Sequence, residues 1–131
     1  MLTQSDLLYN PPLEPYMSIV YRDDNILVLD KPSGLLSVPG HDPRLSDSLA
    51  TRVRTEFPNA QMINRLDKDT SGLVLMSLNK KSHAAIATQF ENRTTQKLYN
   101  AIVWGCMPGD EGFIDLPLAI DPDNKPRHRV D

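Results

Sequence analysis

The sequence predicts an α+β fold with a mixed, mainly antiparallel sheet and flanking helices. Two short β-rich runs, residues 17–21 and 26–30, are separated by only a polar turn. Later in the chain, two segments with helical periodicity alternate with apolar, strand-like runs. A doubly wound parallel sheet would need a helix between every pair of strands, which residues 17–38 do not provide.

The N-terminal half is expected to begin with a hairpin. Residues 17–21 and 26–30 favour strands, and the polar residues 22–25 can form the turn between them. Lys31-Pro32-Ser33-Gly34 ends the second strand, because proline and glycine interrupt a ladder. Residues 35–38 then continue in an extended conformation as far as a Pro-Gly pair.

Two helices are expected, each beginning at a polar N-cap. Ser46 would cap the first helix, which reaches about Phe57. Asn79 would cap the second, over about residues 81–92. Each helix has one apolar face that would pack on the sheet. These faces consist of Leu49 and Val53 in the first helix, and of Ile86, Ala87 and Phe90 in the second.

The remaining strands are predicted from apolar runs and from alternation. A short strand starts at residues 62–63, and residues 72–78 form a nearly continuous apolar run, typical of a strand covered on both faces. Residues 95–104 alternate with a period of two and predict a further strand. Residues 113–118 form a short extended piece, and the tail over 121–131 is polar and basic.

Length and composition indicate one globular domain. The chain has 131 residues, 40% of them hydrophobic, and a net charge of −3. We expect an extended, proline-containing arm over residues 1–16 and a single domain over residues 17–131. The charge argues against an indiscriminate nucleic-acid binder, although a local basic face is enough to bind RNA. No apolar run approaches the ~20 residues of a membrane helix. The single cysteine, Cys106, is consistent with a reducing, cytoplasmic location.

The most informative segment is a polar turn between two apolar runs, residues 63–76, which can hold the carboxylate of Asp67 rigidly at the edge of a sheet. It contains Arg65-Leu66-Asp67 followed by Thr70-Ser71-Gly72. This Arg-Leu-Asp-x-x-Thr-Ser-Gly pattern resembles the catalytic loop of the RluA-type pseudouridine synthases. These enzymes isomerise uridine in RNA with one essential aspartate and no cofactor. The family usually has histidine where this chain has Asn64.

On this resemblance, Asp67 is the catalytic residue. Uridine isomerisation breaks the N1–C1′ glycosidic bond, turns the base and rejoins it through C5. One carboxylate can act as the nucleophile, or as the base that deprotonates the sugar, and no metal is needed. The three histidines, His41, His83 and His128, lie far apart in the sequence and predict no metal cluster.

The same resemblance assigns RNA-binding roles to Arg65 and Tyr99, and Lys97 is a further candidate. The segment 97–105 is similar to the family's Lys-x-Tyr-x-Ala-x-Val-x-Gly strand, in which the tyrosine stacks on the target base. Such stacking replaces the contacts that an extruded base loses, worth ~1–3 kcal/mol. Arg65 would enter the RNA stack where the uridine leaves, and Lys97 is a candidate phosphate contact. The expected partner is a stem-loop of ribosomal or transfer RNA, with no membrane and no metal.

Other interpretations of the Asp67 turn stay open. The residues could build an Asx-type turn closed by Gly72 and nothing more. They also fit positions 1, 3, 5 and 6 of a calcium-binding EF-hand loop, but Leu78 stands at position 12, where a glutamate is required. For the chain as a whole, the alternatives are a non-catalytic RNA-binding remnant of the same fold and a small α+β interaction module.

The resemblance covers about residues 10–130 and corresponds to the N-terminal portion of a synthase. Further on, the family carries a Lys-Pro-x-Thr-Gly-Arg-x-His-Gln-Leu-Arg type motif, whose arginine pairs with the catalytic aspartate. No segment of this sequence matches that motif. We therefore expect the isolated chain to be inactive, and to self-associate through an unpaired sheet edge.

Overall fold

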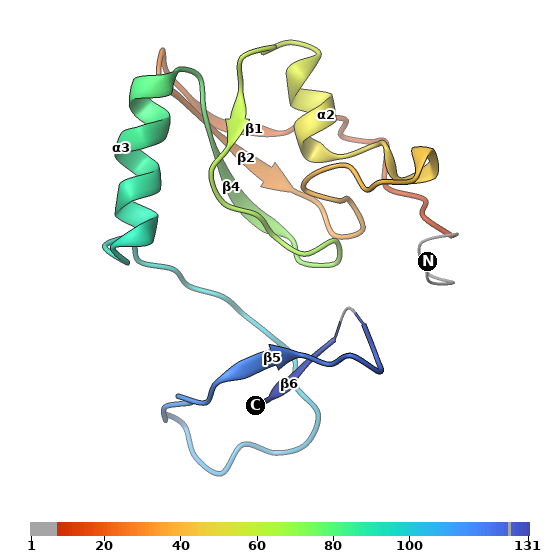
Figure 1. Ribbon diagram of the computed structural model, residues 1–131, viewed down its shortest axis with the longest axis vertical. Helices are drawn as coiled ribbons and strands as arrows, with labels where there is room; N and C mark the ends of the chain where they lie inside the picture. Colours follow the sequence, from red (N-terminus) through yellow and green to blue (C-terminus); the bar gives the residue numbers. More distant parts are fainter. Residues whose placement is uncertain (1–7, 126) are drawn as a thin grey trace. The chain divides into compact units, whose positions relative to one another are not determined.

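The computed structural model describes residues 8–125 and 127–131. These residues form two compact units, divided between Lys97 and Leu98, and each unit is described by itself (Figure 1). The first unit holds a four-stranded sheet and two α-helices, and the second holds a two-stranded sheet with long connecting segments.

The sheet of the first unit has the strand order β1-β2-β4-β3, and every pairing in it is antiparallel. In the centre, Leu27 lies opposite Met76, and Leu29 lies opposite Val74. The predicted α+β class and the mainly antiparallel sheet are confirmed. The strands are β1 (Ile19–Arg22), β2 (Ile26–Lys31), β3 (Gln61–Met62) and β4 (Gly72–Ser77).

The turn between β1 and β2 is fixed by Asp23. Its carboxylate accepts hydrogen bonds from the backbone N–H groups of Asn25 at 2.8 Å and Ile26 at 2.9 Å. A carboxylate that bonds to the backbone two and three residues later stabilises a tight turn. The predicted hairpin is therefore confirmed.

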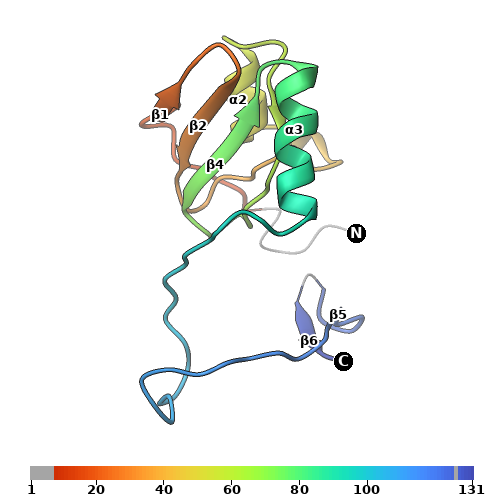
Figure 2. The same cartoon turned by 90° about the vertical axis from the view of Figure 1, so that its left-hand side faces the viewer.

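The core lies on one face of this sheet, beneath α2 (Leu49–Arg54). Side chains alternate between the two faces of a strand, so every second residue of β2 and β4 points toward the core. The fully buried apolar residues from β2, β4 and α2 are Leu27, Leu29, Val74, Met76, Leu49, Ala50 and Val53. Figure 2 shows α2 behind the sheet and α3 in front of it.

The first helix is shorter than predicted. Its N-cap is Ser48, whose hydroxyl accepts a hydrogen bond from the N–H of Thr51 at 3.1 Å. Ser46, the predicted cap, instead ends a short 3-10 helix, η1 (Pro43–Leu45). Asp42 caps η1, and a proline at the first helical position favours this local turn. The Asp-Pro signal therefore forms a separate short helix that ends at Ser46, and the longer helix begins after it.

The second helix, α3 (Lys80–Glu91), agrees with the prediction. Asn79 is its N-cap and accepts a hydrogen bond from the N–H of Ser82 at 2.9 Å. The hydroxyl of Ser77 in β4 hydrogen-bonds to the ring of His83 at 2.9 Å, which places α3 on the face opposite α2. No residue of α3 is fully buried, so its apolar face is only partly covered.

Two predictions about strands were wrong. Leu73 in β4 is 62% exposed, so this strand is not covered on both faces. Residues 95–104 belong to no strand. Alternation gives a segment two faces, but a strand also needs a partner for its backbone groups, and no described residue pairs with 95–104. The second unit pairs β5 (Leu118–Ile120) with β6 (His128–Val130), within and beside the predicted tail.

The described part of the predicted N-terminal arm, residues 8–16, has no helix or strand and is held against α2 by the fully buried Arg52. Its guanidinium donates hydrogen bonds to the carbonyls of Pro12 at 2.9 Å and Tyr16 at 3.2 Å. It also forms an ion pair of 2.7 Å with Asp47. The rest of the predicted arm lies outside the described residues.

Candidate active site

Asp67 lies in the loop of residues 63–71, which connects β3 to β4. The backbone N–H of Thr70 donates to the carbonyl of Asp67 at 3.1 Å, so the predicted polar turn is present. The side chain of Asp67 is exposed. Its carboxylate forms no hydrogen bond or ion pair within the described part of the chain. Both of its oxygens are therefore available to a bound molecule.

The residue before Asp67 fixes the loop to the core. Leu66 is buried, and the hydroxyl of Ser37 donates to its carbonyl at 2.6 Å. The same hydroxyl accepts a hydrogen bond from the N–H of Leu66 at 3.1 Å. Because Ser37 is itself buried, this one side chain satisfies two backbone groups that water does not reach. The sequence analysis assigned no role to Ser37.

Lys31 anchors the same loop on the other side of Asp67, at Lys68. Lys31 is fully buried, and burial lowers the pKa of its ammonium group. The carboxylates of Asp69 and Asp67 have a smaller, opposite effect and raise that pKa. A buried charge needs hydrogen-bond partners to be tolerated. Its ammonium group donates to the backbone carbonyls of Pro32 at 2.9 Å, Leu35 at 2.6 Å and Lys68 at 2.8 Å. The sequence analysis assigned Lys31 only to the segment that ends the second strand.

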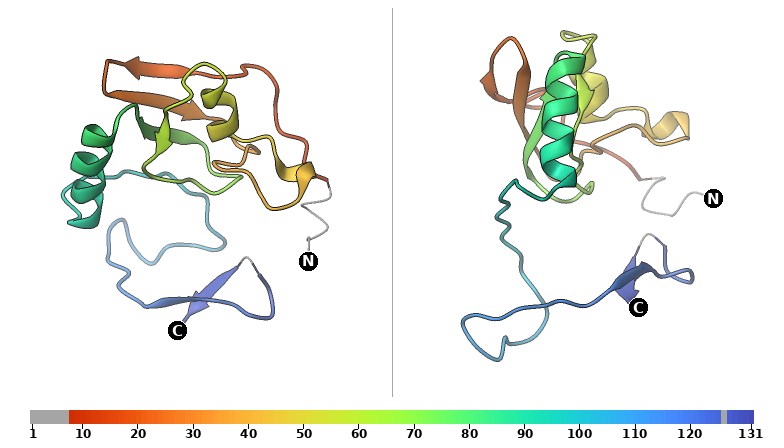
Figure 3. Two further views of the ribbon diagram at one scale, coloured as in Figure 1. Left: turned by 45° about the horizontal axis from the view of Figure 1, so that its top comes forward. Right: turned by 60° about the vertical axis from the view of Figure 1, so that its left-hand side comes forward.

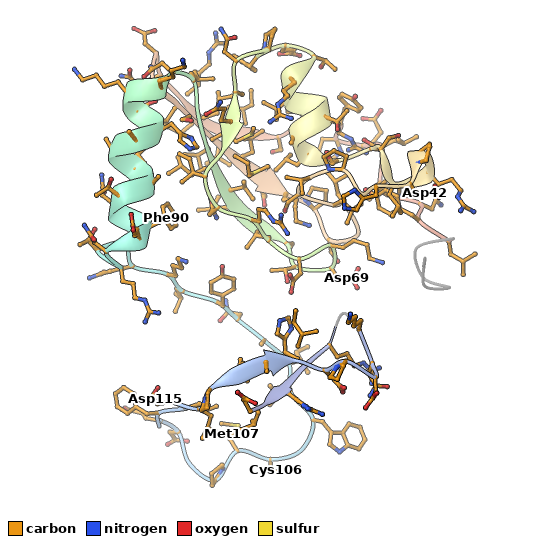
Figure 4. All side chains as sticks on the ribbon, viewed as in Figure 1. Asp42, Asp69, Phe90, Cys106, Met107 and Asp115 are labelled. Atoms are coloured by element: carbon orange, nitrogen blue, oxygen red, sulfur yellow. The ribbon has the colours of Figure 1, made fainter. Side chains whose placement is uncertain are left out.

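Two more hydrogen bonds join the segment after β2 to the Asp67 loop. The N–H of Gly34 donates to the carbonyl of Lys68 at 2.8 Å, and the hydroxyl of Ser33 donates to the carbonyl of Asp69 at 2.7 Å. Gly34 has a φ of +90°, a conformation that favours glycine. The two loops lie side by side in Figure 1 and Figure 3, and Figure 4 labels Asp69 at this turn. The Lys-Pro-Ser-Gly segment thus forms a platform beneath the loop.

Asn64 continues the ladder beyond β3. The side-chain oxygen of Asn64 accepts a hydrogen bond from the N–H of Leu75 at 2.9 Å. The N–H of Ile63 donates to the carbonyl of the same leucine at 3.2 Å. Asn64, which stands where the family usually has histidine, therefore supports the backbone at the entry to the loop.

The other predicted site residues lie in different places. Arg65 is exposed on the same loop as Asp67, two residues before it. The ammonium group of Lys97 lies over the ring of Phe90 at 5.1 Å, a cation–π contact at the end of α3. Tyr99 is 59% exposed and belongs to the second unit. Only Arg65 and Asp67 are thus brought together by one element.

The arrangement around Asp67 differs from an EF-hand, because the loop connects two strands, whereas an EF-hand loop connects two helices. Within residues 8–125 and 127–131, no three His, Cys, Asp or Glu side chains lie close enough to hold a metal ion. In the same residues, no helix combines the length and the apolar character needed to cross a membrane.

The chain belongs to the RNA pseudouridylate synthase family, whose model matches residues 25–131. The resemblance seen in the Asp67 motif is thereby confirmed. The dual-specificity RNA pseudouridine synthase RluA of Vibrio parahaemolyticus is 48% identical over 124 residues, which are 95% of this chain and 50% of that protein. RluA of Escherichia coli K12 is 45% identical over 122 residues, 93% of this chain and 56% of that protein.

Among solved structures, human RNA Pseudouridylate Synthase Domain Containing 1 aligns with a TM-score of 0.46 and 29% identity. The alignment covers 71% of this chain and 31% of the human one. The chain spans about half the length of the curated relatives that it matches.

Proposed function

We propose that this chain provides the Asp67 loop of an RNA pseudouridine synthase, and that Asp67 is the catalytic residue. The observation that carries the proposal is an exposed, unpaired carboxylate on a backbone anchored by the buried Ser37 and Lys31. A group held in this way needs little reorganisation when a substrate arrives. Membership of the family supplies the chemistry that such a carboxylate would perform.

In the proposed reaction, the N1–C1′ bond of a uridine breaks, the base turns, and a new bond forms between C1′ and C5. Asp67 acts as the nucleophile at the sugar or as the base that deprotonates it. The proton on C5 is then lost and N1 takes up a proton, so the product is an isomer of the substrate and no cofactor is consumed. Exposure of the loop suits a large substrate whose base is turned out of a stack.

The proposed partner is a stem-loop of ribosomal or transfer RNA. Arg65 is exposed two residues from Asp67, a place from which a planar guanidinium could fill the gap left by the extruded uridine. We assign Tyr99 to stacking on the base and Lys97 to a phosphate contact. The matched relatives are named dual-specificity RNA pseudouridine synthases, which supports an RNA substrate for this chain. A cytoplasmic location is part of the same proposal.

We further propose that residues 17–131 belong to the catalytic domain and that residues 1–16 are an arm. By itself, the chain is expected to be inactive, because its sequence lacks the family's later motif with the arginine that pairs with aspartate. β1 forms an edge of the four-stranded sheet that the structure describes. An open edge of this kind favours self-association of the isolated chain.

The test of the function is a fusion protein. This chain is joined to the half of Vibrio parahaemolyticus RluA that lies outside the match, and unmodified ribosomal and transfer RNA are added. Pseudouridine is then quantified by mass spectrometry after nuclease digestion, with intact RluA as the positive control. We expect conversion at discrete uridines. RNA binding without conversion would favour the non-catalytic remnant, and neither binding nor conversion would favour the interaction module.

A further inference from the structure

The end of the first unit opposite the Asp67 loop carries a polar hollow. It lies where α2 ends and where β3 and α3 begin, and its volume is about 430 Å³. Small-molecule sites in proteins have volumes of roughly 300–1,000 Å³ and are lined mainly by hydrophobic and aromatic groups. The hollow is large enough for such a site, but most of the side chains that line it are polar. The lining therefore favours a charged or strongly polar ligand.

The charge of the hollow is positive. Arg54 lines it from the end of α2 and Lys80 from the start of α3, and none of the described residues that line it is Asp or Glu. Neither cation forms an ion pair within residues 8–125 and 127–131. A local positive site attracts anions even on a chain whose net charge is −3.

Hydrogen-bond donors for an anion surround the same hollow. The Nε of Arg54 donates to the carbonyl of Ala60, which also lines the hollow, at 3.2 Å. The two terminal nitrogens of the guanidinium take no part in that bond and can bind two oxygens of one phosphate. Asn59 and Gln61 line the hollow as well, and each adds an amide NH₂ group. Phosphate oxygens accept hydrogen bonds from both kinds of donor.

The position of the hollow suits a contact with the backbone of an RNA. The six residues of β4 separate it from the Asp67 loop, a span of about 20 Å for an antiparallel strand. Figure 1 shows the start of α3 at one end of β4, and the loop that carries Asp67 is at the other. A stem-loop extends well beyond the base that it presents, and it carries a charged phosphate at every nucleotide. The same RNA can therefore reach both ends of this strand.

We propose that the hollow between Arg54 and Lys80 binds a backbone phosphate of the RNA, several nucleotides away from the uridine at Asp67. The proposal rests on the proposed function, which supplies RNA as the substrate. Contacts of this kind position a nucleic acid and carry no sequence information. The hollow thus contributes to affinity and orientation and leaves the chemistry to Asp67. A free phosphate ion is the other source of the same group, and the experiment separates the two.

The experiment uses the fusion protein and unmodified transfer RNA. Arg54→Gln is combined with Lys80→Gln, at two exposed positions, and circular dichroism checks that the fold is kept. RNA affinity is measured from about 50 to 200 mM salt. We expect it to fall by on the order of tenfold at the lowest salt, and the slope of log affinity against log salt to decrease by about 1. The conversion rate at saturating RNA should not change, because the hollow lies at the other end of β4 from Asp67.

The matched control combines Lys81→Gln with Arg93→Gln. It removes the same two charges from exposed positions of the first unit that do not line the hollow. We expect it to weaken RNA binding by about twofold or less and to keep the salt slope, because exposed charges outside a contact are screened. Equal losses in the two double variants would overturn the proposal, since the effect would then follow from total charge.

Inorganic phosphate separates the two sources of the ligand. Thermal unfolding of the parent fusion protein and of the Arg54 and Lys80 double variant is followed with and without added phosphate. We expect the RNA affinity of the double variant to fall whether or not phosphate stabilises the parent. Stabilisation of the parent alone, together with an unchanged RNA affinity in the double variant, would overturn the assignment to RNA.

Pseudouridine formation is a separate readout. If the fusion protein binds RNA through the hollow but converts no uridine, the proposed function fails and the phosphate site stands. If the fusion protein converts uridine while the double variant binds RNA like the parent, the proposed function stands and the phosphate site is overturned.

Discussion

Among single residues, two buried polar side chains position the Asp67 loop. Lys31 bonds to the carbonyl of Lys68, directly after Asp67, and Ser37 bonds to the backbone of Leu66, directly before it. A buried ammonium group is unfavourable unless several acceptors surround it, and here three carbonyls do so. The arrangement leaves the carboxylate of Asp67 exposed while its backbone is held.

The first prediction concerns the buried ammonium group. Lys31→Met keeps the apolar stem but removes the donor for three carbonyls. We expect the free energy of unfolding to fall by about 2–4 kcal/mol, since the carbonyls of Pro32 and Leu35 would lose their donor. Urea denaturation measures the change. Lys81→Met, at an exposed position of α3, is the control and should stay within about 0.5 kcal/mol of the parent. Equal stability of the two variants would show that Lys31 does not anchor the loop.

Among single residues, the sequence predicted those site residues that belong to one short motif. It missed the residues that reach the site from other segments of the chain. Arg65 and Asp67 could be placed on one loop because they belong to one short motif. Ser37 could not be found, because its contact with Leu66 spans 29 residues of sequence. Lys31 lies in a recognisable Lys-Pro-x-Gly segment, but its burial depends on carbonyls that only the folded chain brings together.

Among the elements, the described arm and α2 depend on one another through Arg52. Arg52→Met would remove the ion pair with Asp47 and leave the carbonyls of Pro12 and Tyr16 without their donor. We expect a loss of about 2–4 kcal/mol in the free energy of unfolding. Limited proteolysis should also cut the arm faster than in the parent.

Arg54→Met, on the exposed side of the same helix, is the matched control for Arg52→Met. It should change both the unfolding free energy and the rate of arm cleavage far less. If the arm of the Arg52 variant resisted protease as well as the parent does, the arm would be held by other contacts.

The segment that carries Tyr99 provides a second prediction among the elements, made in the fusion protein. Tyr99→Phe should keep stacking on the base, whereas Tyr99→Ala should lose ~1–3 kcal/mol of it, measured as weaker RNA binding. If the hydroxyl takes part in proton transfer at C5, the Phe variant would bind RNA normally but turn over slowly. Full activity in both variants would place Tyr99 outside the site.

Helices and turns were predicted correctly where they depend only on residues close together in the sequence. The Asp23 turn and the Asn79 cap are formed by residues two or three positions apart, and both hairpin and helix were predicted. Ser46 was wrong as the cap of the longer helix, because the Asp42-Pro43 signal forms η1, of which Ser46 is the C-cap. Residues 95–104 alternate like a strand, but no described residue supplies the ladder partner, and alternation carries no information about partners.

For the molecule as a whole, the fold class could be predicted because strand and helix patterns succeed one another in an α+β order. The division between Lys97 and Leu98 could not, since that segment has no linker composition. Residues 98–116 contain large apolar side chains, among them Ile102 and Trp104, and these are exposed in the structure, so the apolar character of the segment did not indicate where the first unit ends.

The most direct test of the account is pseudouridine formation by the fusion protein with Asp67→Asn. Asparagine keeps the size of the side chain but cannot act as nucleophile or base. We predict that conversion falls by a factor on the order of 10² to 10⁴ or more, while RNA affinity and unfolding free energy stay the same. Asp69→Asn, at the exposed neighbour on the same turn, is the control and should retain activity. Conversion near the parental rate in the Asp67 variant would contradict the assignment of Asp67 as the catalytic residue.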